Sequence, residues 1–393
     1  MAGVFQKLKA LDEVPEATPG LSMSSISLHD FRNYADARFE VSPAPVLVLG
    51  PNGVGKTNLL EALSLLAPGR GMRRARAEHL RRHGTGIAWG VAATMQSCNG
   101  LCQIGTGVPA DSETGRRVMR LNGDTVSQAE IGTVLSASWL TPQMDGIFVD
   151  SPGTRRRFLD RLVIAFDPAH IARTNRYEKS LRERAVLLSE GRGDDAWLSA
   201  LELNLAEMAV AITAARLDLI EDINIEAEQG WFGFPGACLN LDGDTERWLA
   251  EMPALAVEEQ LAAAARRARL QGEKTMPGPH ASELGATHLQ TGIAAVMAST
   301  GQQKALLIAV ILAHARLQQR RMGRPPLMLL DDVAAHLDVE RRTSLFEAVG
   351  ELGAQSWFSG TDIDDFNGLV DQAQIIRITV ADTDSGSAII EVV

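Results

Sequence analysis

A glycine-rich loop between an apolar run and a helical pattern constrains the fold of this chain more than any other feature. The aliphatic residues 46–49 lead into Gly50-Pro51-Asn52-Gly53-Val54-Gly55-Lys56-Thr57, and a helical pattern follows to about Leu66. A strand, such a loop and a helix in this order are the context of a phosphate-binding P-loop. The three glycines allow backbone conformations that a Cβ forbids, so N–H groups can approach a phosphate at the helix N-terminus. The segment therefore predicts binding of a nucleoside triphosphate.

Two side chains of this loop carry specific roles. Lys56 supplies a mobile positive charge for the β- and γ-phosphates, and the Thr57 hydroxyl is a ligand for Mg²⁺. Asn58 follows directly in the helix. We expect the whole run from Gly50 to Asn58 to line the nucleotide site.

A second element is an apolar strand, 327–330, that ends in the carboxylates Asp331 and Asp332. Parallel sheets place ligand groups at the carboxyl ends of their strands. Asp331 can hold Mg²⁺ there, and Asp332 can polarise an attacking water as a general base. Acidic residues at strand ends are common, so the pair gains its meaning from the P-loop. Asp338 follows at a helix start, either as a plain N-cap or at a subunit interface.

A third element is the run Ser299-Thr300-Gly301-Gln302-Gln303-Lys304, which opens a helix just ahead of the carboxylate strand. It offers a hydroxyl and free N–H groups at a positive helix terminus, which is a second phosphate grip. A chain with one P-loop can use such a grip on the nucleotide of a partner subunit. The alternative interpretation is an ordinary capped helix.

The charge distribution bears on a nucleic-acid partner. The net charge of −11 argues mildly against one, but arginines gather in three clusters that favour one. These lie at 70–82, at 155–161 and at 266–269. Solvated helix faces are the alternative explanation for such clusters.

Composition limits the cellular setting. The chain has three cysteines, Cys98, Cys102 and Cys238, too few for a disulfide framework, so a reducing cytoplasm fits best. The longest apolar run, 305–313, is far shorter than a membrane span. Residues 1–23 are expected to form a disordered extension and not a signal peptide, with Met23 as an alternative start.

The coarse pattern predicts an α/β protein in three parts. Residues 24–126 form the first α/β part, with strands at 25–28, 37–41, 87–95, 101–104 and 117–121 and a hairpin turn at Asn122-Gly123. Residues 127–277 form a mostly helical insertion, with helices at 154–164, 168–189, 196–227 and 257–270 and a loop or small hairpin at 230–244. Residues 278–393 return to α/β, with helices at 301–319 and 339–352 and strands at 327–330, 356–358, 374–380 and 388–393.

The motifs and their order resemble the ABC-type ATPases of chromosome and repair proteins. Within that group the chain resembles the RecF family, through Leu28-x-x-Phe31-Arg32-Asn33-Tyr34 before the P-loop and Gly69-Arg70-Gly71-Met72-Arg73 after it. Further matches are Ser151-Pro152-x-x-Arg155-Arg156-Arg157-Phe158-Leu159-Asp160 and Gly278-Pro279-His280. The resemblance extends over nearly the whole chain from about Ser24, and the insertion is too short for an SMC coiled coil.

The resemblance implies an ABC-type ATPase head with a helical second lobe and a function in recombinational repair and replication-gap repair. Such proteins bind ATP and Mg²⁺, dimerise head-to-tail around ATP, and hydrolyse it slowly in a DNA-dependent reaction. They bind single-stranded, duplex and gapped DNA, and with RecR and RecO they let RecA load. A cytoplasmic, nucleoid-associated location and a place in the SOS response to DNA damage come with this family.

The resemblance also assigns residues. Arg32 and Asn33 lie by the nucleotide, and Gln143 is the Q-loop residue that senses the γ-phosphate. Ser299, Gly301 and Gln302 reach the nucleotide of the partner. The DNA contacts are expected from Arg70, Arg73, Arg74, Arg76, Arg155, Arg156 and Arg157.

The chain departs from the family pattern at three positions. Asp332 stands where ABC ATPases commonly have Glu, and Ala281 stands where an Arg usually follows Gly-Pro-His. His336 replaces a frequent Glu. The first departure bears on the hydrolysis rate and the second on one DNA or phosphate contact, and neither bears on nucleotide binding. An ATPase subunit of a transporter and a P-loop small-molecule kinase are the alternative functions; the first needs a membrane partner, and the second leaves 299–304 unused.

Overall fold

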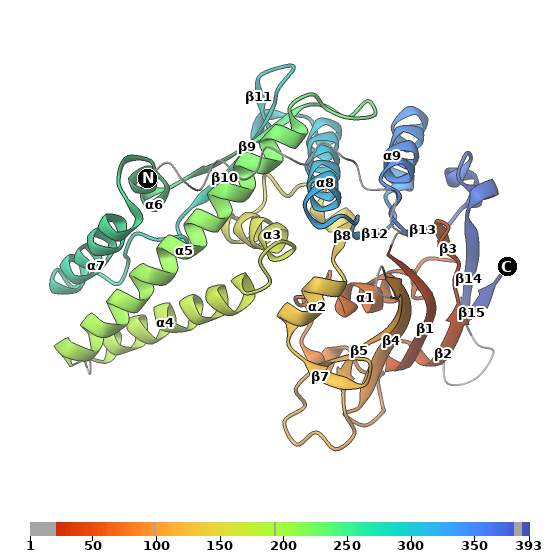
Figure 1. Cartoon of the computed structure of the whole chain (residues 1–393), viewed down its shortest axis with the longest axis horizontal. Coiled ribbons are helices and arrows are strands. Elements are labelled where there is room, and N and C mark those ends of the chain that lie inside the picture. The colour runs from red at the N-terminus through yellow and green to blue at the C-terminus, as the bar shows by residue number, and fades with distance from the viewer. Residues whose placement is uncertain (1–20, 98–99, 192–193, 381–386) are drawn as a thin grey trace.

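Two six-stranded sheets enclose one helix in the first of two lobes of the computed structural model (Figure 1). The structure describes residues 21–97, 100–191, 194–380 and 387–393. The enclosed helix, α1 (Lys56–Leu66), packs against strands of both sheets. Nine of its residues are buried, which is why its pattern is apolar on nearly every side.

The first sheet is antiparallel, in the order β2-β1-β4-β5-β6-β7. Its strands are β1 (Ser22–Phe31), β2 (Tyr34–Glu40), β4 (Trp89–Ser97), β5 (Gly100–Val108), β6 (Val118–Leu121) and β7 (Asp124–Val126). The predicted turn between β6 and β7 is confirmed, because Asn122 has φ 51° and Gly123 has φ 93°. Positive φ at both positions is typical of a two-residue hairpin loop.

The second sheet holds the motifs, in the order β15-β14-β3-β13-β12-β8. Its strands are β3 (Val46–Leu49), β8 (Ala137–Leu140), β12 (Leu327–Leu330), β13 (Ser356–Gly360), β14 (Gln374–Val380) and β15 (Ala388–Val392). All neighbours pair in parallel except β14 with β15. Every residue of β3 and β12 is buried, which explains their continuous apolar runs. The carboxyl ends of β3, β13, β12 and β8 therefore share one edge.

The second lobe is helical and has its own hydrophobic core. It contains α3 (Pro152–Ile164), α4 (His170–Glu190), α5 (Asp195–Ala227), α6 (Asp244–Glu251) and α7 (Ala254–Leu270). Residues of α4, α5 and α7, such as Tyr177, Leu205 and Leu261, form this core. The other end of α5 packs into the main core through Leu219 and Ile223. By length and composition alone α5 could cross a membrane, but its burial in two cores accounts for its apolar character.

The two lobes meet along α8 (Thr300–Met322), which packs against α5 and β8. Next to it lies a small sheet of β9 (Ala237–Asp242), β10 (Glu283–His288) and β11 (Ile293–Ala294). The last long helix is α9 (Val339–Glu351). The predicted helices of the insertion are confirmed to within a few residues, whereas α2 (Gln128–Val134), β8, α6 and β10 were not predicted.

Two expectations about boundaries need comment. The predicted extension 1–23 is wrong at its end, because Met23 is buried in β1 and both its backbone N–H and its carbonyl bond the Gln355 side chain. Residues 1–20 of that prediction lie outside the described residues. Strand β8 falls within the range 127–277 assigned to the helical part, yet it pairs with β12 of the second sheet. The division of the chain into domains otherwise stays a prediction.

Candidate nucleotide-binding site

The loop after β3 takes the shape that its glycines predict. Gly53 has φ 80° and Gly55 has φ 119°, in the region that residues with a Cβ avoid. A Cβ on Gly55 would lie 2.4 Å from Nδ2 of Asn33, which donates a hydrogen bond of 2.7 Å to the Val54 carbonyl. The hydroxyl of buried Tyr34, to which the sequence analysis assigned no role, donates to the Gly55 carbonyl at 2.9 Å. Side chains at the turn between β1 and β2 therefore hold the P-loop through hydrogen bonds to its backbone carbonyls.

Lys56 is held over the same loop. Its ammonium donates to the carbonyls of Gly50 at 2.8 Å and Pro51 at 3.1 Å, and the residue is only 4% exposed. The charge thus lies where loop N–H groups and the N-terminus of α1 attract an anion. This arrangement suits the triphosphate of a nucleotide.

The carboxylates after β12 lie directly beside the P-loop. Thr57 donates from Oγ1 to Oδ1 of Asp331 at 3.0 Å, and Ser359 of β13 donates to the same oxygen at 2.8 Å. Ser359 Oγ also accepts the backbone N–H of Asp332 at 2.9 Å. No sequence pattern singled out Ser359, since it lies inside an ordinary buried strand. Three segments distant in sequence therefore meet at one oxygen.

The chemistry of this group fits Mg²⁺. Burial raises the pKa of Asp331, while the hydrogen bonds from Ser359 and Thr57 lower it and the charge of Asp332 raises it. Mg²⁺ prefers oxygen ligands and commonly takes one or two from protein while phosphates and waters supply the rest. No group of three His, Cys, Asp or Glu side chains that could hold a metal ion occurs among the described residues. Asp332 has φ 48°, a backbone conformation that concentrates at functional sites.

Arg32 and Asn33, both expected beside the nucleotide, have different hydrogen-bond partners. Arg32 forms a bidentate ion pair with Glu61 of α1, with both N···O distances 2.9 Å, and Glu61 is 1% exposed. Asn33 contacts the loop and accepts from Asn58 Nδ2 at 2.8 Å. Arg73, which we expected at DNA, donates to Asn58 Oδ1 at 2.8 Å and lies 3.6 Å from Glu61. The turn, α1 and Arg73 thus form one polar network behind the P-loop.

The run 299–304, called the signature below, begins α8 with a capping box. Ser299 Oγ accepts the N–H of Gln302 at 3.3 Å, and Gln302 Oε1 accepts the N–H of Ser299 at 3.0 Å. This is the capped helix of the alternative interpretation, yet Ser299 and Gly301 stay exposed. Arg341 of α9 donates to the Gly301 carbonyl at 3.3 Å. Asp338 is the N-cap of α9, since its Oδ1 accepts the N–H of Arg341 at 2.8 Å.

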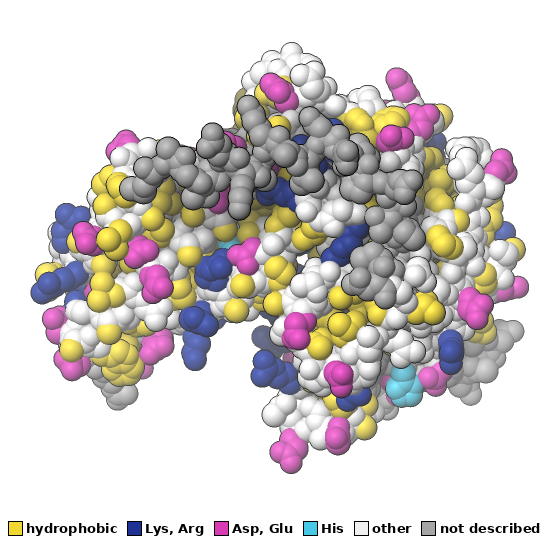
Figure 2. All heavy atoms as spheres, in the orientation of Figure 1, with side chains coloured by type: hydrophobic (Ala, Val, Ile, Leu, Met, Phe, Trp, Pro, Cys, Tyr) yellow, Lys and Arg dark blue, Asp and Glu magenta, His cyan; other side chains and the backbone are white. Residues whose placement is uncertain are grey.

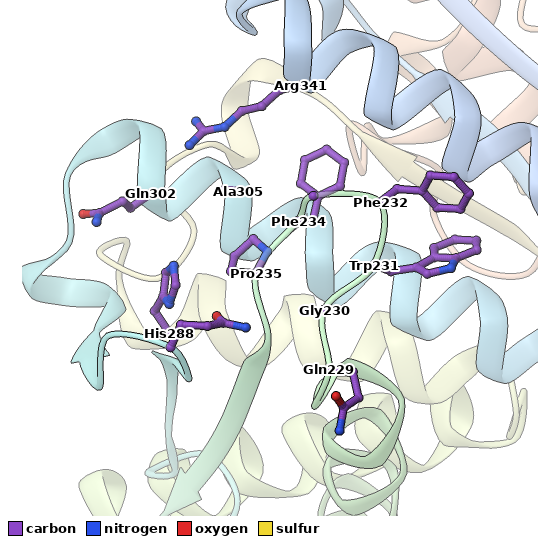
Figure 3. A pocket seen from close by; sticks show the side chains of 12 residues that line it. Gln229, Gly230, Trp231, Phe232, Phe234, Pro235, His288, Gln302, Ala305 and Arg341 are labelled. Atoms are coloured by element: carbon purple, nitrogen blue, oxygen red, sulfur yellow. The ribbon is translucent and has the colours of Figure 1, made fainter.

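A pocket of about 470 Å³ lies beside the signature (Figure 3). Gln302 and Arg341 line one side of it, and the loop Trp231-Phe232-Gly233-Phe234 between α5 and β9 lines another. Two large apolar side chains just before the signature in the sequence are exposed, Val296 at 55% and Met297 at 80%. Such an apolar border around a polar motif is typical of an interface.

Gln143 lies beyond the carboxyl end of β8, at the same edge of the sheet as Asp331. It lies in a short 3-10 helix (Pro142–Met144) after β8, and β8 pairs in parallel with β12. Gln143 is exposed, and the following segment is tied to the signature helix by an ion pair of 3.3 Å between Asp145 and Lys304. Its role as a γ-phosphate sensor stays a prediction.

The seven arginines expected at DNA do not form one patch. Arg155 pairs with Glu283 of β10, and Arg156 donates to the carbonyl of the preceding Ser282 at 2.8 Å, so both attach α3 to the start of that strand. Arg76 is exposed and lies 3.6 Å from Glu78. The remaining members besides Arg73 line one cavity between the lobes; they are Arg70, Arg74 and Arg157. Figure 2 shows Lys and Arg side chains on both sides of the hollow between α4 and α2.

Comparisons with known proteins agree with this geometry. Residues 22–362 match the family described as RecF/RecN/SMC N terminal domain. The DNA replication and repair protein RecF of Mesorhizobium japonicum is 42% identical over 363 residues, which are 91% of this chain and 96% of that protein. RecF of Agrobacterium fabrum is 41% identical over 369 residues, covering 92% of this chain and 98% of that protein.

Solved structures share the fold. The recombination mediator protein RecF with ATPrS in the RecFOR pathway has a TM-score of 0.81 at 22% identity, covering 96% of this chain and 99% of that one. The Smc head domain of Pyrococcus furiosus bound to the C-terminal domain of ScpA has a TM-score of 0.54 at 16% identity, covering 95% and 96%. The predicted ABC-type ATPase head with a helical second lobe is confirmed.

Proposed function

Because this chain belongs to the RecF family of the RecF/RecN/SMC proteins, we propose that it is an ATP-binding protein of DNA replication and repair that acts in the RecFOR pathway. The observation that carries the proposal is the meeting of Thr57 and Asp331 at 3.0 Å beside a complete P-loop. This arrangement unites the two parts that a P-loop ATPase needs to hold a metal-bound triphosphate.

Each residue of the site has a task in hydrolysis. The loop N–H groups and Lys56 hold the phosphates, while Thr57 and Asp331 would hold Mg²⁺, which neutralises charge on the β- and γ-phosphates when bound. Asp332 accepts a proton from the attacking water or orients it. Gln143 monitors the γ-phosphate from the end of β8. Asp332 is one methylene shorter than the usual Glu, so slow hydrolysis that serves as a switch is expected.

A second copy completes the site. Ser299 and Gly301 are exposed, and Val296 and Met297 just before them in the sequence are apolar and exposed as well. We infer that this surface packs on the ATP-loaded P-loop of a second subunit, so that ATP joins two heads and hydrolysis releases them. The 470 Å³ pocket beside Gln302 lies at the border of that surface.

DNA is the proposed partner of the closed dimer. Arg70, Arg74 and Arg157 lie at the hollow between the lobes, where phosphate contacts would give little sequence specificity and strong salt dependence. Binding of single-stranded, duplex and gapped DNA, DNA-dependent ATP hydrolysis, and cooperation with RecR, RecO and RecA belong to this proposal. A cytoplasmic location, in association with the nucleoid, is also part of this proposal.

A matched pair of serine variants tests the dimer. Ser299 and Ser127 are both exposed N-caps with complete capping boxes, on α8 and α2. Ser299→Arg should abolish ATP-dependent dimerisation in light scattering and leave ATP binding by the monomer nearly unchanged. Ser127→Arg should damage a helix cap equally and still dimerise. Normal ATP-dependent dimerisation of Ser299→Arg would contradict the sandwich.

Gel shifts on gapped DNA with and without ATP test the DNA partner. We expect a shift that ATP strengthens and that salt weakens. If no ATP-dependent shift occurs at any salt concentration, DNA is not the partner, and the transporter and kinase alternatives regain weight.

A further inference from the structure

A cavity of about 360 Å³ separates the first lobe from α3 and α4. One wall is the segment 68–74 after α1, and the other walls are β8 with the residues that follow it and the inward sides of α3 and α4. Small-molecule sites have volumes of about 300–1,000 Å³ and combine apolar walls with a few placed polar groups. Apolar lining residues are Met72, Trp139, Met144, Ile147, Ile164 and Ile171.

Four of the residues that line this cavity are arginines that form no ion pair among the described residues. Arg70, Arg74, Arg157 and Arg161 line it, and none of them belongs to an ion pair among the described residues. Of the acids beside them, Asp160 is already bound by Arg216 at 2.8 and 3.0 Å and by His170 at 2.8 Å. Glu178 is the other acid that lines the cavity. The cavity therefore carries excess positive charge.

Arg161 is the deepest of the four. Its guanidinium lies 4.5 Å from the ring centre of Trp139 and 5.2 Å from that of Phe158. Nη1 reaches only the Met144 sulfur, at 3.6 Å, and Nη2 is buried with no hydrogen-bond partner among the described residues. Burial, with the charge of Arg74 acting in the same direction, lowers the pKa of Arg161 to about 9, so the group is still charged at neutral pH. An unpartnered buried donor of this kind is costly unless a ligand meets it.

The charge and the walls together define the ligand. A single carboxylate carries one negative charge, whereas a phosphate monoester carries about −1.5 to −2 and three acceptor oxygens, which suits several forked guanidiniums. The apolar wall suits an attached base. We propose that this cavity binds a phosphate monoester on an aromatic body, namely a nucleoside monophosphate unit, at a site separate from the P-loop.

The unit can come from a free nucleotide or from a terminal phosphate of a DNA strand. The strand-end source rests on the proposed DNA binding, while binding of the free unit does not. If the cavity binds no nucleoside monophosphate, the tests of the ATP-dependent dimer and of DNA binding above are unaffected. The two proposals can therefore fail separately.

Calorimetric titration of the full chain tests the site, with Mg²⁺ and a non-hydrolysable ATP analogue saturating the P-loop. Thymidine monophosphate should bind and thymidine should not. Arg74→Ala and Arg157→Ala, both at exposed positions, should each weaken binding about tenfold or more. Arg176→Ala removes an exposed arginine of α4 that does not line the cavity and should bind like the parent chain. Arg161→Met should abolish binding. If the Arg161→Met variant does not fold, Arg74→Ala and Arg157→Ala alone decide the test.

Competition with thymidine hexamers identifies the source. Displacement by hexamers with a terminal phosphate, but not by hexamers with hydroxyl ends, supports the site and assigns it to strand ends. Displacement by neither hexamer supports it as a site for free nucleotides. Equal displacement by both, absence of thymidine monophosphate binding, or unchanged binding in Arg74→Ala and Arg157→Ala would overturn the proposal.

Discussion

The hydroxyl of Thr57 donates a hydrogen bond of 3.0 Å to Oδ1 of Asp331, although the two residues lie 274 positions apart. Ser359 donates to the same oxygen at 2.8 Å and accepts the N–H of Asp332 at 2.9 Å. The expected metal ligands and the expected base are thus connected through one serine. Such preorganisation reduces the rearrangement that binding and hydrolysis require.

Asp332→Asn should separate ATP binding from hydrolysis. The amide cannot accept a proton from the attacking water, so we expect hydrolysis to fall by about 100-fold or more while ATP binding persists. ATP-bound dimers should then last longer. Single-turnover phosphate release and light scattering measure the two effects. Asp371→Asn, an exposed acid of the same lobe, should hydrolyse ATP normally, and a similar loss in both variants would contradict the role of Asp332.

Ser359→Ala should weaken the metal site without removing a ligand. Asp331 would lose its donor from β13, and groups that orient metal ligands typically contribute about 10–100-fold to affinity. We therefore expect the Mg²⁺ concentration for half-maximal hydrolysis to rise about tenfold. Ser356→Ala truncates another buried serine of the same strand and serves as the control. An equal rise in both variants would mean that packing of β13, and not Ser359, is responsible.

Glu61→Ala should lower the free energy of unfolding of the first lobe. Glu61 is 1% exposed and balances Arg32, with Arg73 at 3.6 Å, so its loss leaves a partly buried guanidinium unpaired. Breaking a buried ion pair by removing one partner costs about 3–5 kcal/mol. Urea denaturation should show this loss, whereas Arg247→Ala, which breaks exposed pairs with Asp242 and Asp244, should change stability little. A stability near that of the parent chain would show that Arg32 finds another partner.

The sequence predicted the parts of the site that are contiguous in the chain. The P-loop and the strand ending in Asp331 and Asp332 carry their meaning in short segments, because a strand, a turn and a helix terminus are local structures. Sheet order then brings the two together, since β13 pairs with both β3 and β12. Ser359 was missed because its own segment resembles an ordinary core strand. Tyr34 belongs to the quoted family motif, but its hydrogen bond to the Gly55 carbonyl depends on the fold and was not predicted.

The arginine clusters show the same limit for charge. Arg155, Arg156 and Arg157 are adjacent in sequence, but the first two bond Glu283 and the Ser282 carbonyl, and Arg157 lines the cavity between the lobes. Whether an arginine is free to bind a ligand depends on distant acceptors, and a pattern of charges in the sequence does not contain that information. Arg73 is the same case, since Asn58 and Glu61 draw it to the P-loop helix.

Two histidines, the half-buried His280 and the buried His314, should make the fold less stable in mild acid. Burial lowers the pKa of His280 to about 4, with the charges of Arg156, Arg216 and Arg184 acting in the same direction, and burial lowers that of His314 to about 4. His280 Nδ1 lies 2.7 Å from the Tyr177 hydroxyl, and His314 Nε2 lies 3.0 Å from the Leu162 carbonyl. Both rings are therefore neutral in the fold at neutral pH.

The direction of the pH effect follows from these pKa values. Between pH 6.5 and pH 4 the unfolded chain binds protons at these histidines and the folded chain does not, so stability falls as the pH falls. From pH 7 to pH 5 we expect each histidine to reduce the free energy of unfolding by about 2 kcal/mol. Urea denaturation across this range measures the slope. His280→Gln should remove the His280 share of this fall, about 2 kcal/mol, whereas His79→Gln, at an exposed position, should leave the slope unchanged. If His280→Gln keeps the full slope, His280 does not titrate on unfolding, and its bond with Tyr177 does not hold it neutral.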